Sequence, residues 1–183
     1  KAILVLKEGK RKAKEAGNSS CMGALLRHLG FCLGEVNDIT NAEDYFEASL
    51  LLARGLGKRK EELDILLRCG EIYVKSKDFE QALNLLKEGL ELAENYHDKR
   101  HEGLFFIKIG DTYSLMQEKQ NAMENYMKAL GPLKKAKEMI LVDEINRKLN
   151  HSFELTEENE GSTESKKVIR PIQKPSRGKG LGL

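Results

Sequence analysis

The chain lacks tryptophan, long hydrophobic runs and any paired spacing among its three cysteines. The apolar stretch at residues 3–6 is too short for a membrane span or for the core of a signal peptide. The cysteines are odd in number and show no C-x-x-C pattern, which argues against a disulfide framework. They indicate reduced thiols in the core of a cytosolic protein: Cys21, Cys32 and Cys69.

Signatures of catalysis and of cofactor binding are also missing. The sequence contains no P-loop and no Rossmann glycine pattern. His97 and His101 have a spacing that two metal ligands can use, but no glutamate follows the first histidine, so a polar joint between helices is the favoured interpretation. The net charge of +2 does not favour nucleic acid over protein as a partner. We therefore expect a protein that is not an enzyme and has no metal, no cofactor, no nucleic-acid partner and no membrane segment.

A repeat with an interval of 40 residues is the most informative feature that is present. Small residues recur at this interval in two series, one of alanines and one of glycines: Ala2, Ala42, Ala82 and Ala122, then Gly30, Gly70 and Gly110. A constant interval with constant chemistry indicates one supersecondary unit copied in tandem.

The unit has the pattern of two helices joined by a short turn. In the second copy, two large residues, a small one and another large one follow at helical spacing along one stripe: Leu66, Cys69, Gly70 and Tyr73. The glycine in this stripe lets a neighbouring helix come close. A second stripe follows at Ala82, Leu86 and Gly89. Polar joints between the stripes, such as residues 76–78, are typical of a helix end and the next helix cap.

At these positions the chain resembles the tetratricopeptide repeat family, whose pattern is W-x2-L-G-x2-Y, A-x3-F and a closing proline. The tryptophan is replaced by Leu26, Leu66 and Phe106, and the proline by Arg54, Glu94 and Lys134. The interval is six residues longer than the usual 34, which resembles the Pins/LGN class of adapters. The resemblance implies an all-α fold, a right-handed α-solenoid of antiparallel helical hairpins.

The repeat phase divides the chain into six segments. Residues 1–17 match the second helix of a truncated upstream repeat, so we expect a fragment of a protein with more repeats. Repeats at 23–56, 63–96 and 103–136 follow, then a capping helix at 137–153. Pro132 predicts a kink or an early end in the last hairpin. Residues 154–183, acidic and then basic, have the composition of a flexible tail.

A basic residue recurs at one position of each first helix: His28, Arg68, Lys108 and Lys148. At about 100° per residue, this position points roughly 150° away from the core stripe. In the family the first helices line a concave groove, so the resemblance implies a ligand channel beside this row. Matching groove positions are Arg27, Leu67, Ile107 and Arg147, then Phe31, Glu71 and Asp111.

The groove positions suggest what would bind. Phe31, Leu67 and Ile107 would supply apolar pockets, and the basic row would attract carboxylates. An ordinary solvated face is the alternative, and Glu71 and Asp111 are placed to neutralise the row. We expect an adapter in the cytoplasm, cytoskeleton or cilium that binds a protein or an acidic peptide. The alternatives are a structural role by lateral packing in a large assembly, and contact between the groove and the tail at 154–164.

Overall fold

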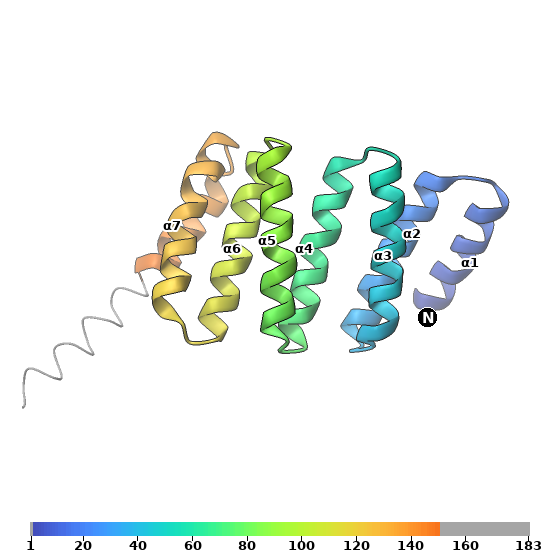
Figure 1. Cartoon of the computed structure of the whole chain (residues 1–183), viewed down its shortest axis with the longest axis horizontal. Coiled ribbons are helices and arrows are strands. Elements are labelled where there is room, and N and C mark those ends of the chain that lie inside the picture. Colours follow the sequence, from blue (N-terminus) through green and yellow to red (C-terminus); the bar gives the residue numbers. More distant parts are fainter. Residues whose placement is uncertain (1, 151–183) are drawn as a thin grey trace, which may run out of the picture.

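The computed structural model describes residues 2–150, which form a single row of antiparallel helices (Figure 1). The labelled helices are α1 (Ala2–Glu15), α2 (Ser19–Glu35), α3 (Ile39–Gly55), α4 (Arg59–Lys75), α5 (Phe79–Asn95), α6 (Lys99–Leu115) and α7 (Lys119–Lys135). Residues 139–150 are also helical, and within 2–150 there is no strand. The predicted all-α solenoid is thus confirmed. The predictions for the tail, and for the end of the capping helix, fall outside the described residues.

The helices end at identical joints every 20 residues. At the first hairpin, the N–H of Asp38 donates to the carbonyl of Leu33 (2.9 Å) and the N–H of Asn37 to that of Gly34 (3.0 Å). This Schellman pair of bonds closes each helix and requires a positive φ at the residue that follows the cap. That residue has φ between 57° and 65° at all seven joints: Gly17, Asn37, Gly57, Lys77, His97, Gln117 and Lys137.

Each first helix begins four residues before the repeat bounds taken from the sequence pattern. Its first turn is mostly polar and lies outside the apolar stripe. In the third hairpin this turn is capped by Asp98, whose carboxylate accepts from the N–H of His101 at 3.1 Å. Capping satisfies a donor that has no partner within the helix, so the helix extends further than its apolar residues indicate.

The repeating glycines allow close packing inside each hairpin, as the sequence predicts. A Cβ atom on Gly70 of α4 would stand 2.6 Å from Leu86 of α5. A Cβ atom on Gly110 of α6 would stand 2.7 Å from the ring of Tyr126 on α7. The interhelix distance in each hairpin therefore depends on the missing side chain.

Three hydrophobic clusters fill the row from end to end, as expected of a repeat protein whose units contact only their neighbours. First helices of successive hairpins also contact each other, α2 with α4 and α4 with α6, whereas α3 and α5 barely meet. The row therefore bends with α2, α4 and α6 on its inner side.

Two sequence predictions about single residues need correction. Pro132 does not end its helix early, because α7 continues to Lys135. Ala129 and Leu133 are fully buried around it, and the N–H of Ala136 donates to the Pro132 carbonyl at 2.9 Å, so packing and closing bonds hold the last turn. Core thiols were expected, yet only Cys69 is buried: Cys32 is half-buried and Cys21 is exposed.

Candidate peptide-binding groove

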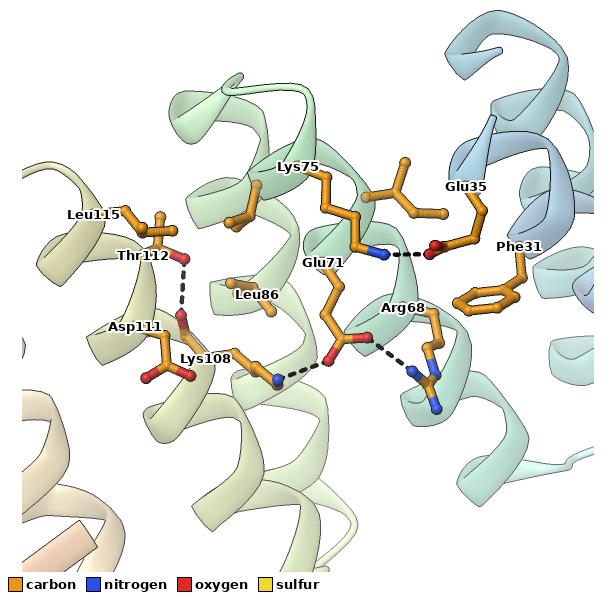
Figure 2. Close-up of a pocket in the computed structure, with 12 residues that line it drawn as sticks. Phe31, Glu35, Arg68, Glu71, Lys75, Leu86, Lys108, Asp111, Thr112 and Leu115 are labelled. Carbon is orange, nitrogen blue, oxygen red and sulfur yellow. Dashed lines mark hydrogen bonds and ion pairs between the residues drawn. The ribbon is translucent and has the colours of Figure 1, made fainter. Parts of the chain in front are cut away.

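A cavity of about 410 Å³ opens on the inner side of the row, where α2, α4 and α6 meet (Figure 2). Apolar side chains from all three helices contribute to its wall, and charged side chains stand around them. The apolar residues are Phe31, Ile72, Val74, Leu86 and Leu115, and the charged ones are Glu35, Arg68, Glu71, Lys75, Lys108 and Asp111. The cavity is therefore built by several repeats together.

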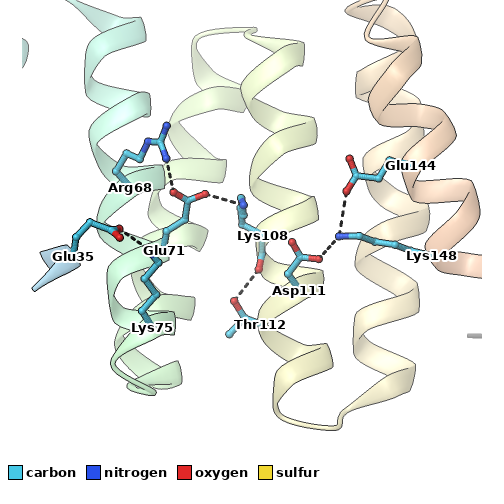
Figure 3. A network of polar contacts seen from close by, with 9 residues as sticks. All are labelled: Glu35, Arg68, Glu71, Lys75, Lys108, Asp111, Thr112, Glu144 and Lys148. Carbon is cyan, nitrogen blue, oxygen red and sulfur yellow. Dashed lines mark hydrogen bonds and ion pairs between the residues drawn. The ribbon is translucent and has the colours of Figure 1, made fainter. Parts of the chain in front are cut away.

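The charged side chains form a ladder of ion pairs between successive first helices (Figure 3). The Glu71 carboxylate lies 3.0 Å from the guanidinium of Arg68 and 2.7 Å from Lys108 Nζ. One repeat later, Lys148 Nζ lies 2.6 Å from Asp111 and 3.6 Å from Glu144. The two acids that the sequence placed beside the basic row thus pair with it, and Lys75 pairs with Glu35 in the same way.

Aromatic rings occupy two places along this ladder. The guanidinium of Arg68 lies over the ring of Phe31, 5.4 Å from its centre, which is a cation–π arrangement. The hydroxyl of Tyr126 donates to Asp111 at 2.8 Å. Burial and the neighbouring Asp111 both raise the pKa of Tyr126, so this phenol stays protonated and keeps donating.

A second hollow of about 260 Å³ continues the cavity toward α2. It is lined by Arg27, His28, Phe31, Asp64 and Arg68, and it shares Phe31 and Arg68 with the larger cavity. In the described part of the chain, Arg27 and His28 form no ion pair with a carboxylate. Asp64 lines the same hollow and interacts electrostatically with Arg27, so the charge of Arg27 is balanced in part, but less tightly than those of Lys108 and Lys148.

The structure separates the remaining predicted groove residues from the cavity. Leu67 and Ile107 are 9% and 6% exposed and belong to the hydrophobic clusters, so Phe31 is the member of the predicted apolar trio that lines the cavity. Arg147 is exposed on helix 139–150, where its Nε donates to the Asp143 carbonyl (3.3 Å). Lys148 reaches the groove through Asp111.

One set of residues that line the cavity was not predicted from the sequence. Glu35, Lys75 and Leu115 stand at the same position of three successive copies, and all three line the cavity. The three residues recur at the same interval of 40 residues as the basic row, and this recurrence is the sequence signal for them.

The pair of histidines has no metal-site geometry. His97 occupies a joint with φ of 57°, and among residues 2–150 no cluster of three or more metal-ligating side chains occurs. His101 is buried, with Nδ1 at 2.9 Å from Asp98 and Nε2 at 3.2 Å from Asp64. Burial opposes its charge, but the bonds with Asp64 and Asp98 outweigh burial and raise the pKa of His101.

Comparisons with known proteins agree with this architecture. Two family models, both described as tetratricopeptide repeat, match residues 21–95 and 105–131, together more than half of the chain. The chain belongs to the tetratricopeptide repeat family, a family of protein-interaction modules. A search of the curated proteins gave no significant match.

Among solved structures, the crystal structure of BtubC (BKLC) from P. vanneervenii is similar to this chain. The TM-score is 0.56 at 15% identity, and the match covers 100% of this chain and 84% of that one. This likeness shows the fold alone. Separately, none of the described helices is long and apolar enough to cross a membrane.

Proposed function

We propose that this chain is a non-catalytic adapter segment that captures a peptide in the inner groove, in the cytoplasm or on a cytoskeletal or ciliary structure. The observation that carries the proposal is the cavity of about 410 Å³, to which three first helices contribute apolar and charged side chains together. Its volume lies in the range of about 300–1,000 Å³ that is usual for ligand sites. Residues from separate repeats converge on one open space, which is the arrangement that solenoids use for extended ligands.

The lining favours a peptide with one acidic and one apolar anchor. An acidic side chain near Lys108 or Lys148 would have to compete with Glu71 or Asp111, which already hold these lysines. At the other end, Arg27 forms no ion pair among residues 2–150 and only shares the hollow with Asp64, so an acidic residue of the peptide would meet weaker competition there. The apolar side chain would then enter the larger cavity beside Phe31.

A pull-down from cell lysate, read by mass spectrometry, tests the proposal. The Arg68→Glu/Lys108→Glu variant reverses two groove charges, and Lys87→Glu/Lys135→Glu makes the same change on the exposed surfaces of α5 and α7. Circular dichroism first establishes that all three proteins fold alike. Partners that are lost from the groove variant and kept by the control support capture in the groove. Identical partner lists for all three proteins would refute it.

A structural role is the second candidate, and exposed apolar residues on the outer helices favour it. Leu4 on α1 and Leu51 on α3 are both 73% exposed, and Met127 on α7 is 50% exposed. Lateral packing into an assembly would cover such side chains. Under this alternative, Leu51→Ser/Met127→Ser would release the assembly partners while the groove variant kept them.

Contact between the acidic stretch 154–164 and the groove is a further hypothesis about residues outside the described part. The hypothesis rests on the charge complementarity between this acidic stretch and Arg68, Lys108 and Lys148. The ion pairs of Glu71 and Asp111 reduce the gain from such a contact. Deleting residues 154–183 should tighten peptide binding if the stretch competes for the groove, and unchanged affinity would exclude competition.

A further inference from the structure

A second cavity, distinct from the inner groove, lies between the outer helices α3 and α5 with α4 as its floor. We call it the α3–α5 furrow; it has a volume of about 160 Å³. Its apolar wall comes from Ile39, Phe46 and Leu50 on α3, Cys69 and Ile72 on α4, and Leu85 on α5. A cavity of about 150 Å³ with such a lining accepts a benzene-sized group, so the furrow fits one large apolar side chain.

The furrow is open because of one change in the repeat. Glu43 lines it, whereas the equivalent residue of the next copy is Leu83, which is 8% exposed and part of a hydrophobic cluster. The carboxylate of Glu43 instead accepts a hydrogen bond from the hydroxyl of Tyr73 at the edge of the furrow. At the position where the next copy packs Leu83 into its core, the α3–α5 furrow has Glu43. The furrow therefore lacks a leucine that would fill it.

A neighbouring hollow extends the surface along α3. It has a volume of about 350 Å³ and shares Glu47 and Leu50 with the furrow. Leu51, which is 73% exposed, lies in this hollow. Two adjacent depressions are therefore present on one side of α3, the furrow with a mainly apolar wall and the hollow with apolar residues Ala48, Leu50 and Leu51 beside charged ones.

The rim of these depressions is acidic and lacks basic partners. Glu43, Asp44 and Glu47 stand on it, and among residues 2–150 no lysine or arginine forms an ion pair with any of them. Arg54 also lines the hollow, but its guanidinium is held by Glu62 at 2.6 Å and Glu88 at 3.0 Å. A fitting occupant would combine apolar side chains with positive charge.

Residues 166–174 of this same chain have that chemistry. The segment reads Lys-Lys-Val-Ile-Arg-Pro-Ile-Gln-Lys, with four basic residues around Val168, Ile169 and Ile172. The 18 residues from 151 to 168 span up to about 60 Å when extended. Five helix spacings of about 8–10 Å, from helix 139–150 back to α3, amount to about 40–50 Å. The segment is therefore long enough to reach the furrow.

We propose that the α3–α5 furrow binds the basic segment 166–174, with Ile169 and Ile172 in the two depressions and the lysines at the acidic rim. Two isoleucines three residues apart match two depressions that share a wall. Lys108 and Lys148 of the inner groove already have carboxylate partners, whereas no lysine or arginine among residues 2–150 pairs with the acids of the furrow. The charge gain at the furrow is therefore larger than at these two lysines. The segment would cover this outer surface and leave the groove open.

Zero-length carbodiimide cross-linking of the full chain tests the contact, because the reagent joins a carboxylate to a lysine amine only when they touch. Mixing heavy-isotope and unlabelled chains separates links within one chain from links between chains. We expect links within one chain from Glu43, Asp44 or Glu47 to Lys166, Lys167 or Lys174. Ile169→Asp/Ile172→Asp keeps every carboxylate of the furrow and should reduce these links at least fivefold, and the control Glu80→Gln/Glu91→Gln on α5 should not reduce them.

Three results would overturn the proposal. These are links from the tail lysines to groove carboxylates such as Glu71 alone, links to a second copy of the chain alone, and no links at all.

Discussion

Lys108 Nζ on α6 lies 2.7 Å from the carboxylate of Glu71 on α4, and Lys148 repeats this relationship with Asp111 at 2.6 Å. In the first copy, Phe31 takes the place of the acid and Arg68 lies over its ring. The contact between successive first helices is thus copied with the repeat. It joins neighbouring hairpins and at the same time partly neutralises the cations that face the groove.

Replacing the shared acid should weaken this ladder only slightly. Glu71→Gln removes the partner of both Arg68 and Lys108, whose side chains are 53% and 34% exposed, so we expect a loss of less than about 1.5 kcal/mol in unfolding free energy. Urea denaturation at 0.1 M and 1 M salt measures this loss in unfolding free energy. The difference between Glu71→Gln and the native chain should be smaller at 1 M salt, because salt screens the ion pairs. Glu80→Gln, which removes an exposed acid of α5, is the control. A loss that is independent of salt would contradict an electrostatic ladder.

The close approaches at glycine should make alanine destabilising inside the row. A Cβ on Gly89 would stand 2.2 Å from the fully buried ring of Phe105, so Gly89→Ala should cost about 1–3 kcal/mol despite the better helix propensity of alanine. Gly55→Ala is the matched control, because nothing lies within 4 Å of its Cβ position. In thermal unfolding, the Tm of Gly89→Ala should be lower than that of the native chain, and the Tm of Gly55→Ala should be equal to it or higher. The reverse order would show that this packing is looser than described.

Glycine at the joints should stabilise the chain. Lys77, Gln117 and Lys137 hold φ of 62–64°, a conformation that costs an L-residue about 1 kcal/mol. Lys77→Gly and Gln117→Gly should each raise the unfolding free energy by about 0.5–1 kcal/mol. Gly57→Ala, at a joint with φ of 65°, should lower it by a similar amount. Chemical denaturation of the three variants measures these changes in unfolding free energy. Equal stability of all three would show that the left-handed conformation at the joints does not affect the stability of the chain.

His101 should make stability depend on pH above neutrality. Its raised pKa means that the folded state binds a proton more tightly than the unfolded state does. This contribution is fully present below the unfolded pKa of about 6.5 and is lost as the pH rises through the folded pKa. The difference in unfolding free energy between the native chain and His101→Gln should therefore shrink from pH 6 to pH 9. A difference that is constant or grows with pH would contradict a protonated bridge between Asp64 and Asp98.

The architecture could be predicted from the sequence because the repeat copies its packing residues. The interval of Ala42, Ala82 and Ala122 reports a buried contact that each hairpin needs, and all three are at most 4% exposed. The exact extent of the helices was harder to predict, because capping extends α6 four residues beyond its apolar pattern. The early helix end predicted from Pro132 was wrong for a related reason. Burial of Leu133 outweighs the tendency of proline to end a helix.

The candidate site was predictable only in part. Helical geometry excluded Arg68 and Lys108 from the core stripe, and the family resemblance predicted that they border the groove, where the cavity lies. The same geometry could not separate Leu67 and Ile107 from the cavity, because their burial depends on how closely successive first helices pack. The cavity itself arises between three repeats, so no single copy of the repeat contains it.

Peptide capture by the inner groove is tested most directly by one binding measurement. Peptides selected from a random display library on the full chain are titrated by fluorescence anisotropy against the native chain, Leu115→Trp and Ile140→Trp. Leu115 lines the cavity and is 60% exposed, so a tryptophan there fills the cavity without disturbing the core, and Ile140, 81% exposed on helix 139–150, is the control. Capture in the groove predicts at least tenfold weaker binding, about 1.4 kcal/mol, for Leu115→Trp alone. Equal affinity of all three proteins would contradict it.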